Sequence, residues 1–506
     1  HINENLYYDT METTAARDKV LEDPEGKLGG LNAVLFKRLP MREWDRWIDA
    51  KMVHPFFVPV TSTVNNSDLN AVAGYRADDT RPVDLLQGVP TAVPCGAFGG
   101  SEDWSVSKNG AIAISARPPL APDEAWTTNR HIYLMKNISS KTSEEVTGEN
   151  FEELLGECIT KGNPGYDTNP VFSPDGKRLA WLTMKSPTYE SDAVGILVYD
   201  LETQVTSTLL EAETDWDYSP NSLTWSEDGK TLFFTADVRS RQALCSIDST
   251  LGAKQPNGGI RILKGDQSTF LHGEVANSGS RAGHLLLASV QSLTMPTELF
   301  VIDSRGDETG LRQVTHFNTQ RVADTKLGQV KEFTYRGEKG DDVQSWLIYP
   351  AGFTQTEGLS ESTPTDPLQK HPLVVIYHGG PQGSSADDWH YRWNLQYFAS
   401  MGFAVLAPNF HGSTGFGHEF CRDITGNWEI GGRDTIHGVR AVLTEHSWID
   451  PRRVVGLGGS YGGYTSNWLN GNAPEGMFQA LVCHCGTFGM RSSYYATDEL
   501  FFKETE

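Results

Sequence analysis

The sequence predicts two domains, an N-terminal β-propeller and a C-terminal α/β domain with a doubly wound sheet. A turn signature recurs along the first two thirds of the chain, and beyond residue 330 strands alternate with helices. The length of 506 residues also exceeds the ~250–300 residues that a single hydrophobic core usually reaches. We therefore expect a partial propeller over residues 1–328 and an α/β domain over residues 329–506.

The propeller is predicted from a degenerate repeat of short β-rich segments. Residues 172–181 are echoed by residues 225–234 and more weakly by residues 104–113, each with an Asp-Gly or Asn-Gly turn before an apolar strand. Such turns are the strongest short hairpin signal. Matching serines at 107, 173 and 226 give a spacing close to that of propeller blades, which favours a propeller over a β-sandwich. We expect four or five recognisable blades, with further blades missing at the N-terminus.

The α/β domain is predicted from the order of its apolar segments. An antiparallel pair over 330–335 and 343–349 is followed by a polar loop over 354–369 and a buried strand over 372–377. A helix over 391–400, a strand over 403–407, and a helix with Ile436, Val439, Val442 and Leu443 on one face come next. The strand over 453–457 completes an alternation that implies a parallel, doubly wound sheet.

Composition excludes several classes of function. A formal charge of −23 disfavours nucleic acid as a partner, and no apolar run approaches the ~18 residues of a membrane span. The six cysteines are scattered, so we expect reduced thiols rather than a disulfide framework. Cys483-His484-Cys485 is expected to be a buried strand whose histidine points away from both cysteines, so we predict no metal and no cofactor.

One segment carries a specific chemical prediction. The run Gly458-Gly459-Ser460-Tyr461-Gly462 follows an apolar strand, and this is the context of the serine nucleophile elbow of α/β-hydrolases. Upstream, the segment 378–381 reads His-Gly-Gly-Pro and also follows an apolar strand. A glycine-rich loop at that point can aim backbone N–H groups at a developing oxyanion. Ser460 is the expected nucleophile, and the amide of Tyr461 the expected donor.

These two motifs below a propeller resemble the prolyl oligopeptidase class of serine peptidases. Segments 389–394, 412–417, 497–500, 123–126 and 189–192 are similar to its dipeptidyl-peptidase 5 branch, near the acylaminoacyl peptidases. The resemblance implies a propeller that restricts entry to small peptides, and oxyanion amides at Tyr461 and Gly380, with Gly379 as the neighbouring possibility. It also implies release of dipeptides from free N-termini, with Glu124 and Glu190 as candidate anchors for the substrate ammonium. The alternative is that both glutamates are ordinary surface carboxylates.

The sequence departs from the family pattern at several positions. His411 stands where the family usually has arginine, and Cys485 where it usually has aspartate. The family also places the triad aspartate and histidine later than the 46 residues that follow Ser460. Neither His378 nor His484 is a convincing substitute base. We therefore expect a chain truncated at both ends, which lacks the triad Asp and His and is inactive by itself.

Three readings of the function stay open at this point. The leading one is a serine exopeptidase that releases dipeptides through an acyl-enzyme, and its alternative is an acylaminoacyl peptidase or oligopeptidase. A reading from another class is a catalytically inactive pseudoenzyme or a structural propeller subunit. The expected partners are a short peptide substrate and a second copy in a homodimer or larger assembly. The protein is expected to be soluble, and its compartment, cytoplasmic or secreted, is undecided.

Overall fold

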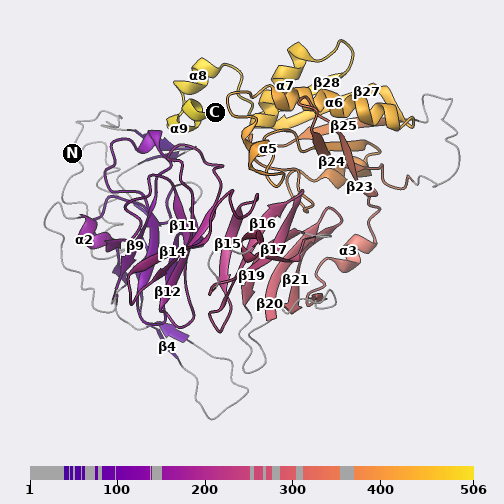
Figure 1. Cartoon of the computed structure of the whole chain (residues 1–506). Coiled ribbons are helices and arrows are strands. Elements are labelled where there is room, and N and C mark those ends of the chain that lie inside the picture. The colour runs from indigo at the N-terminus through magenta and orange to yellow at the C-terminus, as the bar shows by residue number, and fades with distance from the viewer. Residues whose placement is uncertain are drawn as a thin grey trace. The chain divides into compact units, whose positions relative to one another are not determined.

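The computed structural model describes most of the chain (Figure 1). The described residues are 39–44, 46–48, 52–58, 60–62, 75–77, 82–96, 99–136, 138, 151–250, 256–265, 269–275, 285–303, 311–353 and 370–506. The polar loop predicted over residues 354–369 lies outside them. The chain divides into two compact units. One comprises residues 1–188, 199–205 and 498–501, and the other comprises residues 189–198, 206–497 and 502–506.

Four four-stranded antiparallel sheets follow one another along the first part of the chain, as expected for propeller blades (Figure 1). Their strand orders are β10-β9-β8-β7, β11-β12-β13-β14, β15-β16-β17-β18 and β19-β20-β21-β22. The strands are β7 (Trp104–Val106), β8 (Ile112–Ala116), β9 (His131–Met135), β10 (Glu157–Cys158), β11 (Asp167–Phe172), β12 (Arg178–Thr183), β13 (Gly195–Asp200), β14 (Val205–Leu210), β15 (Pro220–Trp225), β16 (Thr231–Val238), β17 (Arg241–Asp248), β18 (Arg261–Lys264), β19 (Thr269–Val275), β20 (Leu285–Ser292), β21 (Met295–Asp303) and β22 (Leu311–Gln313).

The repeated turns have the same internal hydrogen bonds, which explains why the signature recurs. Ser173 Oγ donates to Asp175 Oδ1 at 2.6 Å, and Ser226 Oγ donates to Asp228 Oδ1 at 2.7 Å. In each turn the aspartate also accepts the backbone N–H of the lysine two residues later. The following glycines at 176 and 229 have φ of 68° and 67°, a left-handed conformation that glycine adopts without strain. The predicted hairpins between β11 and β12 and between β15 and β16 are confirmed.

Shorter elements surround these sheets. Three two-stranded sheets lie near the N-terminus of the described chain, pairing β1 with β2, β3 with β6 and β4 with β5. The bounds of these short elements are β1 (Arg42–Glu43), β2 (Arg46–Trp47), β3 (Phe56–Phe57), β4 (Val60–Ser62), β5 (Tyr75–Ala77), β6 (Val83–Asp84), η1 (Ser101–Asp103), η2 (Glu124–Trp126), α2 (Phe151–Leu155), η4 (Pro256–Gly259) and α3 (Thr319–Ala323). The domain boundary predicted at residues 328 and 329 falls between α3 and β23 and remains a prediction.

A six-stranded mixed sheet follows, in the order β23-β24-β26-β25-β27-β28. β23 and β24 are antiparallel, as are β24 and β26, whereas β26, β25, β27 and β28 run parallel, so the predicted doubly wound sheet is confirmed. Its elements are β23 (Val330–Arg336), β24 (Asp342–Ile348), β25 (His371–Tyr377), α4 (Leu395–Ser400), β26 (Ala404–Pro408), α5 (His418–Arg422), α6 (Ile430–Glu445), β27 (Ile449–Gly459), α7 (Tyr461–Asn472), β28 (Ala480–His484), α8 (Met490–Tyr494) and α9 (Leu500–Thr505).

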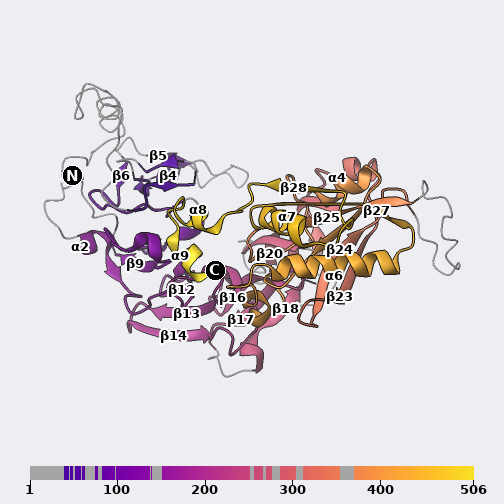
Figure 2. The same ribbon diagram turned by 90° about the horizontal axis from the view of Figure 1, so that it is seen from above.

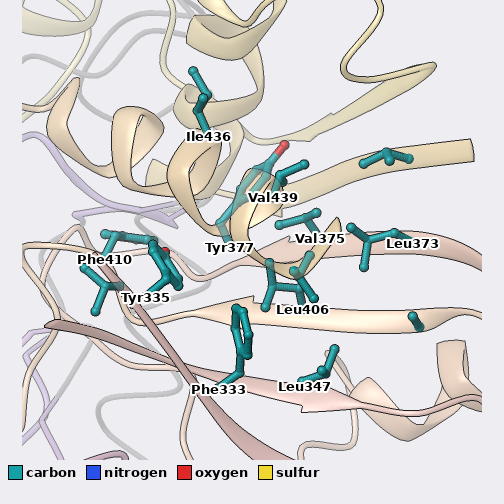
Figure 3. Close-up of a cluster of buried hydrophobic side chains, with 14 of the residues drawn as sticks. Phe333, Tyr335, Leu347, Leu373, Val375, Tyr377, Leu406, Phe410, Ile436 and Val439 are labelled. Atoms are coloured by element: carbon teal, nitrogen blue, oxygen red, sulfur yellow. The ribbon is translucent and has the colours of Figure 1, made fainter. Parts of the chain in front are cut away.

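Helices cover both faces of this sheet. On one face the alternate residues Leu373, Val375 and Tyr377 of β25 pack against α6 and α7 (Figure 3). On the other face Val374 and Ile376 pack in the cluster that contains α4. Figure 2 shows α4 and α6 on opposite sides of the strands. Because both faces are buried, each strand reads in the sequence as a continuous apolar run, which is why these strands were predictable.

The helix predicted over residues 391–400 is shorter than expected. It begins at Leu395, because the Asn394 side chain caps it by accepting the N–H of Tyr397 at 3.3 Å. The preceding residues turn around His390 instead, whose Nδ1 accepts the backbone N–H of Arg392 and of Trp393. A local side-chain bond of this kind competes with helix formation and sets the helix start.

Within the second unit, buried polar groups join the β15–β18 sheet to the mixed sheet. Asn409, at the end of β26, donates from Nδ2 to Ser240 Oγ at 2.9 Å and to Gln344 Oε1 at 2.6 Å. Its Oδ1 accepts the N–H of Ser385 at 2.7 Å. All three groups of the amide are therefore occupied in a site without water access, where an unpaired group is costly.

Candidate active site

Ser460 occupies the sharp turn between β27 and α7. Its backbone has φ of 57° and ψ of −119°, a conformation that non-glycine residues rarely adopt. The strain is held in place because the Ser460 N–H donates to the C=O of His484 on β28 at 2.9 Å, while the Ser460 C=O accepts the N–H of Tyr464 in α7. The serine side chain is exposed at the end of the sheet. The geometry is that of a nucleophile elbow.

The neighbouring glycines are required for close packing. A Cβ at Gly458 would lie 2.4 Å from the Tyr377 ring and 2.7 Å from the backbone of Gly462. A Cβ at Gly462 would lie 2.4 Å from the Tyr377 carbonyl oxygen. Only glycine lets the strand, the turn and the helix approach one another at these distances. The GxSxG spacing in the sequence therefore has a steric cause in the fold.

The loop after β25 brings its glycines to the serine. A Cβ built on Gly379 would lie 3.3 Å from Ser460 Cβ and 3.0 Å from the carbonyl oxygen of Gly459, so this glycine is adjacent to Ser460. Gly380 follows with φ of 133° and is exposed. Tyr461 is the first residue of α7, where backbone N–H groups have no partner within the helix and point along its positive end. The fold thus brings Tyr461 and the Gly379–Gly380 segment to the same turn.

His378 supports this loop in its neutral form. Its Nδ1 lies 2.7 Å from the C=O of Gly379, which can only accept, so Nδ1 carries the proton and donates. Its Nε2, 2.8 Å from Ser413 Oγ, then accepts the serine hydroxyl. Burial lowers the pKa of His378 to about 4. With both nitrogens engaged and its charge disfavoured, His378 shapes the loop and is not positioned as a base for Ser460.

A second loop, residues 410–414, supports the first and was missed by the sequence reasoning. The Phe410 ring stacks on the His378 ring with centroids 4.2 Å apart, and it also packs 5.5 Å from the Tyr461 ring. The Thr414 N–H donates to the C=O of Gly383 at 2.8 Å, at the far end of the His378 loop. The only signal in the sequence was the family-like segment around Gly412, which does not reveal these contacts.

Comparison with known proteins identifies this geometry. A model of the prolyl oligopeptidase family matches residues 389–506, which include the elbow and the segment 389–394. Residues 389–506 therefore carry the sequence pattern of the prolyl oligopeptidase family. Dipeptidyl-peptidase 5 of Aspergillus fumigatus is 29% identical over 484 residues, covering 94% of this chain and 61% of that protein. A probable dipeptidyl-peptidase 5 of Trichophyton verrucosum is 31% identical over 479 residues, covering 94% of this chain and 60% of that protein.

Solved structures share the fold of this chain. The acylaminoacyl peptidase of Pyrococcus horikoshii aligns with a TM-score of 0.62 at 18% identity, over 94% of this chain and 62% of that one. A puromycin-hydrolyzing peptidase of Mycobacterium tuberculosis aligns with a TM-score of 0.57 at 16% identity, over 89% of this chain and 71% of that one. At these identities the likeness establishes the architecture alone. The chain spans about 60% of the length of the curated relatives.

The described part of the chain contains no hydrogen-bond partner for the Ser460 hydroxyl. His484, the nearest histidine along β28, contacts Ser460 through its backbone, while its ring packs edge-on against Trp393 at 5.7 Å. The structure therefore places Ser460, the start of α7 at Tyr461 and the Gly379–Gly380 segment at one turn. Among the described residues it places no side chain in hydrogen-bond contact with the Ser460 hydroxyl.

The two predicted ammonium anchors differ in their surroundings. Glu124, in η2, is half-buried and pairs with Arg117, whose Nη1 lies 3.1 Å from Glu124 Oε1. Glu190 is exposed and follows Tyr189, whose hydroxyl accepts from Gln382 Nε2 at 3.3 Å in the loop that begins at His378. The structure therefore links the neighbour of Glu190, in the same compact unit, to the oxyanion loop, and shows Glu124 already neutralised by a cation.

The Cys483-His484-Cys485 segment differs from its prediction. Residues 480–484 do form a strand, but Cys483 and Cys485 are exposed, because β28 pairs with β27 alone among the described strands. The expected alternation also ends at Cys485, which has φ of 49° and places its Sγ 3.7 Å from His484 Nε2. A buried strand was therefore the wrong prediction. All six cysteines of the chain are free.

Asp341, His411 and Asp423 each place one possible metal-ligand atom within 4.8 Å of the others. Lys339 Nζ lies 2.7 Å from Asp423 Oδ1 and already supplies a positive charge there.

Among the described residues, no helix combines the length and the apolar character that a membrane crossing requires.

Proposed function

We propose that this chain carries the nucleophilic part of a serine exopeptidase that releases dipeptides from the free N-termini of short peptides. The observation that supports it most is the strained elbow, which holds an exposed Ser460 hydroxyl beside Gly379 and the N-terminus of α7. Strain at a single exposed serine between a strand and a helix serves acyl transfer and has no evident structural purpose.

In the proposed reaction, Ser460 Oγ attacks the carbonyl carbon of the second substrate residue while a base removes its proton. The negatively charged oxygen of the tetrahedral intermediate accepts hydrogen bonds from the backbone N–H groups of Tyr461 and of Gly380 or Gly379. Each such bond lowers the activation free energy by ~3–4 kcal/mol. The peptide amine departs with a proton, and water then hydrolyses the dipeptidyl ester. Since the described residues supply no base, the group that removes the proton is left unassigned.

The substrate class rests on the resemblance to proteins called dipeptidyl-peptidase 5 at 29% and 31% identity. An enzyme that cleaves after the second residue from a free N-terminus needs a carboxylate to bind the substrate ammonium group. Of the two candidates, Glu190 is the better supported, because its neighbour Tyr189 bonds to the oxyanion loop. Glu124 remains the second candidate.

A second candidate function is an acylaminoacyl peptidase or oligopeptidase. It is favoured by the pairing of Glu124 with Arg117, which leaves one of the two proposed anchors without net charge to offer a substrate ammonium. Such an enzyme accepts blocked N-termini and needs no carboxylate anchor. The inactive, structural role is the third candidate, and the absence of a base for Ser460 among the described residues favours it.

One experiment separates the three. The purified protein is treated with a fluorophosphonate probe and then assayed on a dipeptide amide with a free amine and on its acetylated form. When the protein is prepared with the partner that supplies the general base, labelling that is lost in Ser460→Ala, with hydrolysis of the free-amine substrate alone, is the expected result. A preference for the acetylated substrate would replace the proposal by the acylaminoacyl reading. No labelling of the wild-type protein would leave only the non-enzymatic role.

The anchor is tested with charge-neutral variants. Glu190→Gln should raise KM for the free-amine substrate by about tenfold or more, because a charged hydrogen bond is lost, and should leave the labelling of Ser460 by the fluorophosphonate probe unchanged. Glu202→Gln is the matched control, because Glu202 is an exposed glutamate in the turn before β14. If Glu190→Gln and Glu202→Gln behave alike, Glu190 is not the anchor.

A further inference from the structure

His411 lies at the base of the loop that supports the oxyanion loop. It stands where the resemblance leads one to expect an arginine, in the 410–414 loop directly after Phe410. Its side chain is fully buried and stacks on the Phe420 ring with centroids 4.4 Å apart. A buried, titratable ring thus stands where the resemblance leads one to expect a group that is always charged.

Both ring nitrogens of His411 face carboxylates. Nδ1 lies 2.7 Å from Asp434 Oδ2, and Nε2 lies 3.2 Å from Asp341 Oδ2. Asp423 Oδ2 is 3.9 Å from the same Nε2. A neutral imidazole has only one N–H, so one of its nitrogens would turn a lone pair toward a carboxylate. When both nitrogens carry protons, each of them can donate a hydrogen bond to the carboxylate that it faces.

Asp434 is placed to accept hydrogen bonds from three sides. It is fully buried in α6, and its Oδ2 accepts the backbone N–H of His411 at 2.8 Å in addition to the ring. Its Oδ1 accepts the N–H of Glu338 at 2.8 Å. The two backbone N–H groups require an acceptor, and among the described residues the His411 ring is the one basic group that pairs with this carboxylate.

The charged groups around His411 come from three elements. Asp341 lies in the turn between β23 and β24, Asp423 follows α5, and Asp434 belongs to α6. Lys339, in the same turn as Asp341, pairs with Asp423 at 2.7 Å. With His411 protonated, two cations face three carboxylates, of which Asp341 is exposed to solvent.

The 410–414 loop connects His411 to the loop that begins at His378 and to the turn at Ser460. At one end Phe410 packs on His378 and Tyr461, and in the middle Ser413 Oγ bonds to His378 Nε2 at 2.8 Å. At the other end the Thr414 N–H bonds to Gly383. The loop therefore touches the oxyanion loop at both of its ends, and His411 is its link to α6 and to the β23–β24 turn.

We propose that His411 is a positioning residue whose imidazolium ties the 410–414 loop to Asp434 and Asp341, so that proton binding at His411 controls the order of the oxyanion loop. The predicted effect on reactivity rests on the proposed function, in which Ser460 is the nucleophile. The predicted effect of His411 protonation on the order of the two loops does not depend on that assignment.

The direction of the pH dependence follows from the linkage of protonation to order. Burial acts to lower the pKa of His411, but the hydrogen bond and the charge of Asp434, with those of Asp341 and Asp423, outweigh it and raise the pKa above its ordinary value of 6.5. A raised pKa means that the tie is complete below about pH 6.5 and is lost as the pH rises through the raised value. The oxyanion loop should therefore loosen on the alkaline side.

The test compares wild-type protein with His411→Arg, which keeps the charge at every pH, and His411→Gln, which never carries it. Hydrogen–deuterium exchange of peptides spanning 378–383 and 410–414 is measured from pH 6 to pH 9. The ratio of the wild-type rate to the His411→Arg rate removes the intrinsic pH dependence. That ratio should be near one at pH 6 and rise by about tenfold by pH 9, while His411→Gln exchanges fast throughout.

His437→Gln is the matched control. His437 lies on the same helix, α6, and its Nε2 is 3.0 Å from Glu338 Oε2, but this pair is solvent-exposed. It should exchange like the wild-type protein at every pH. A parallel measurement of the fluorophosphonate labelling rate at Ser460 should show the same alkaline loss in the wild-type protein relative to His411→Arg.

Each outcome decides a separate question. A ratio of wild-type to His411→Arg exchange that stays constant across the pH range would overturn the proposal. Exchange in His411→Gln that is as slow at pH 6 as in the wild-type protein would also overturn it. A divalent cation that slows exchange in the wild-type protein but not in His411→Arg would replace it by a cation site. A pH-dependent ratio without any labelling of Ser460 would keep the tie and remove the proposed catalytic function.

Discussion

Gly462→Ala is the sharpest test of the elbow. Gly462 is the second residue of α7, and a Cβ there would lie 2.4 Å from the carbonyl oxygen of Tyr377 and 3.0 Å from that of His378. Both atoms belong to the backbone at the end of β25, so no flexible side chain can move aside. The helix must therefore shift by about 1 Å to restore an ordinary contact of ~3.4 Å, which places strain on Ser460 and on the Tyr461 amide.

The magnitude follows from two opposing effects. Overpacking of this kind typically costs about 1–3 kcal/mol, whereas replacing glycine by alanine within a helix stabilises it by about 0.5–1 kcal/mol. Gly471→Ala isolates the second effect, because Gly471 is in the same helix and a Cβ there meets nothing within 4 Å. The difference between the two variants is then the steric cost, about 1–3 kcal/mol, with Gly471→Ala at or above the wild-type stability.

Stability is measured by urea-induced unfolding and reactivity by the rate of fluorophosphonate labelling at Ser460. Since a displacement of about 1 Å can reduce a reaction rate by about 100-fold, Gly462→Ala should label far more slowly than the wild-type protein. Gly471→Ala should label at the wild-type rate. Equal stability and equal labelling of the two variants would refute the steric account of the GxSxG spacing.

Three further predictions concern the surrounding framework. Because burial lowers the pKa of His378 to about 4, below the ordinary 6.5, the unfolded chain binds the proton more readily. The stability contribution is therefore complete above about pH 6.5 and falls by roughly 3 kcal/mol toward pH 4, which urea titrations at stepped pH will detect and His378→Asn will flatten. Tyr461→Phe removes a 2.5 Å hydrogen bond to the Trp428 carbonyl and should lower the free energy of unfolding by about 1–3 kcal/mol. Ser460 labelling should persist, since the backbone amide of residue 461 is unchanged. Loss of labelling would argue against the assignment of that amide as an oxyanion donor. Asn409→Ala should cost at least about 2 kcal/mol in the same unfolding assay, because the buried Ser240 and Gln344 side chains and the part-buried Ser385 N–H lose their hydrogen bonds. Asn472→Ala, at an exposed site, should stay within about 0.5 kcal/mol.

Much of the fold was predictable because its signals are local. The SPDG-type turns at Ser173 and Ser226 form their hydrogen bonds within a few residues, so the same letters give the same hairpin wherever they occur. The strands of the mixed sheet are buried on both faces and appear as apolar runs. Ser460 was predictable for the same reason, since its glycines at 458 and 462 record a steric demand within five consecutive residues.

Features that depend on distant contacts were not predictable in the same way. Cys483 and Cys485 were expected to be buried, but burial of a strand depends on neighbours far along the chain, and β28 has only β27 beside it among the described strands. The helix before β26 starts four residues later than expected, because His390 and Asn394 bind nearby backbone groups.

The sequence alone determined the order of the two kinds of architecture and the position of the strained turn at Ser460, from which the proposed chemistry follows. Those conclusions rest on interactions between residues close together in the chain, which leave a readable pattern. Only the tertiary structure decided the roles of His378, His411 and the 410–414 loop. Their partners are 23 to 70 residues away for His411 and 35 for the His378–Ser413 pair, so no local pattern records them. A departure from a family motif at His411 became interpretable once the fold placed carboxylates on both sides of its ring.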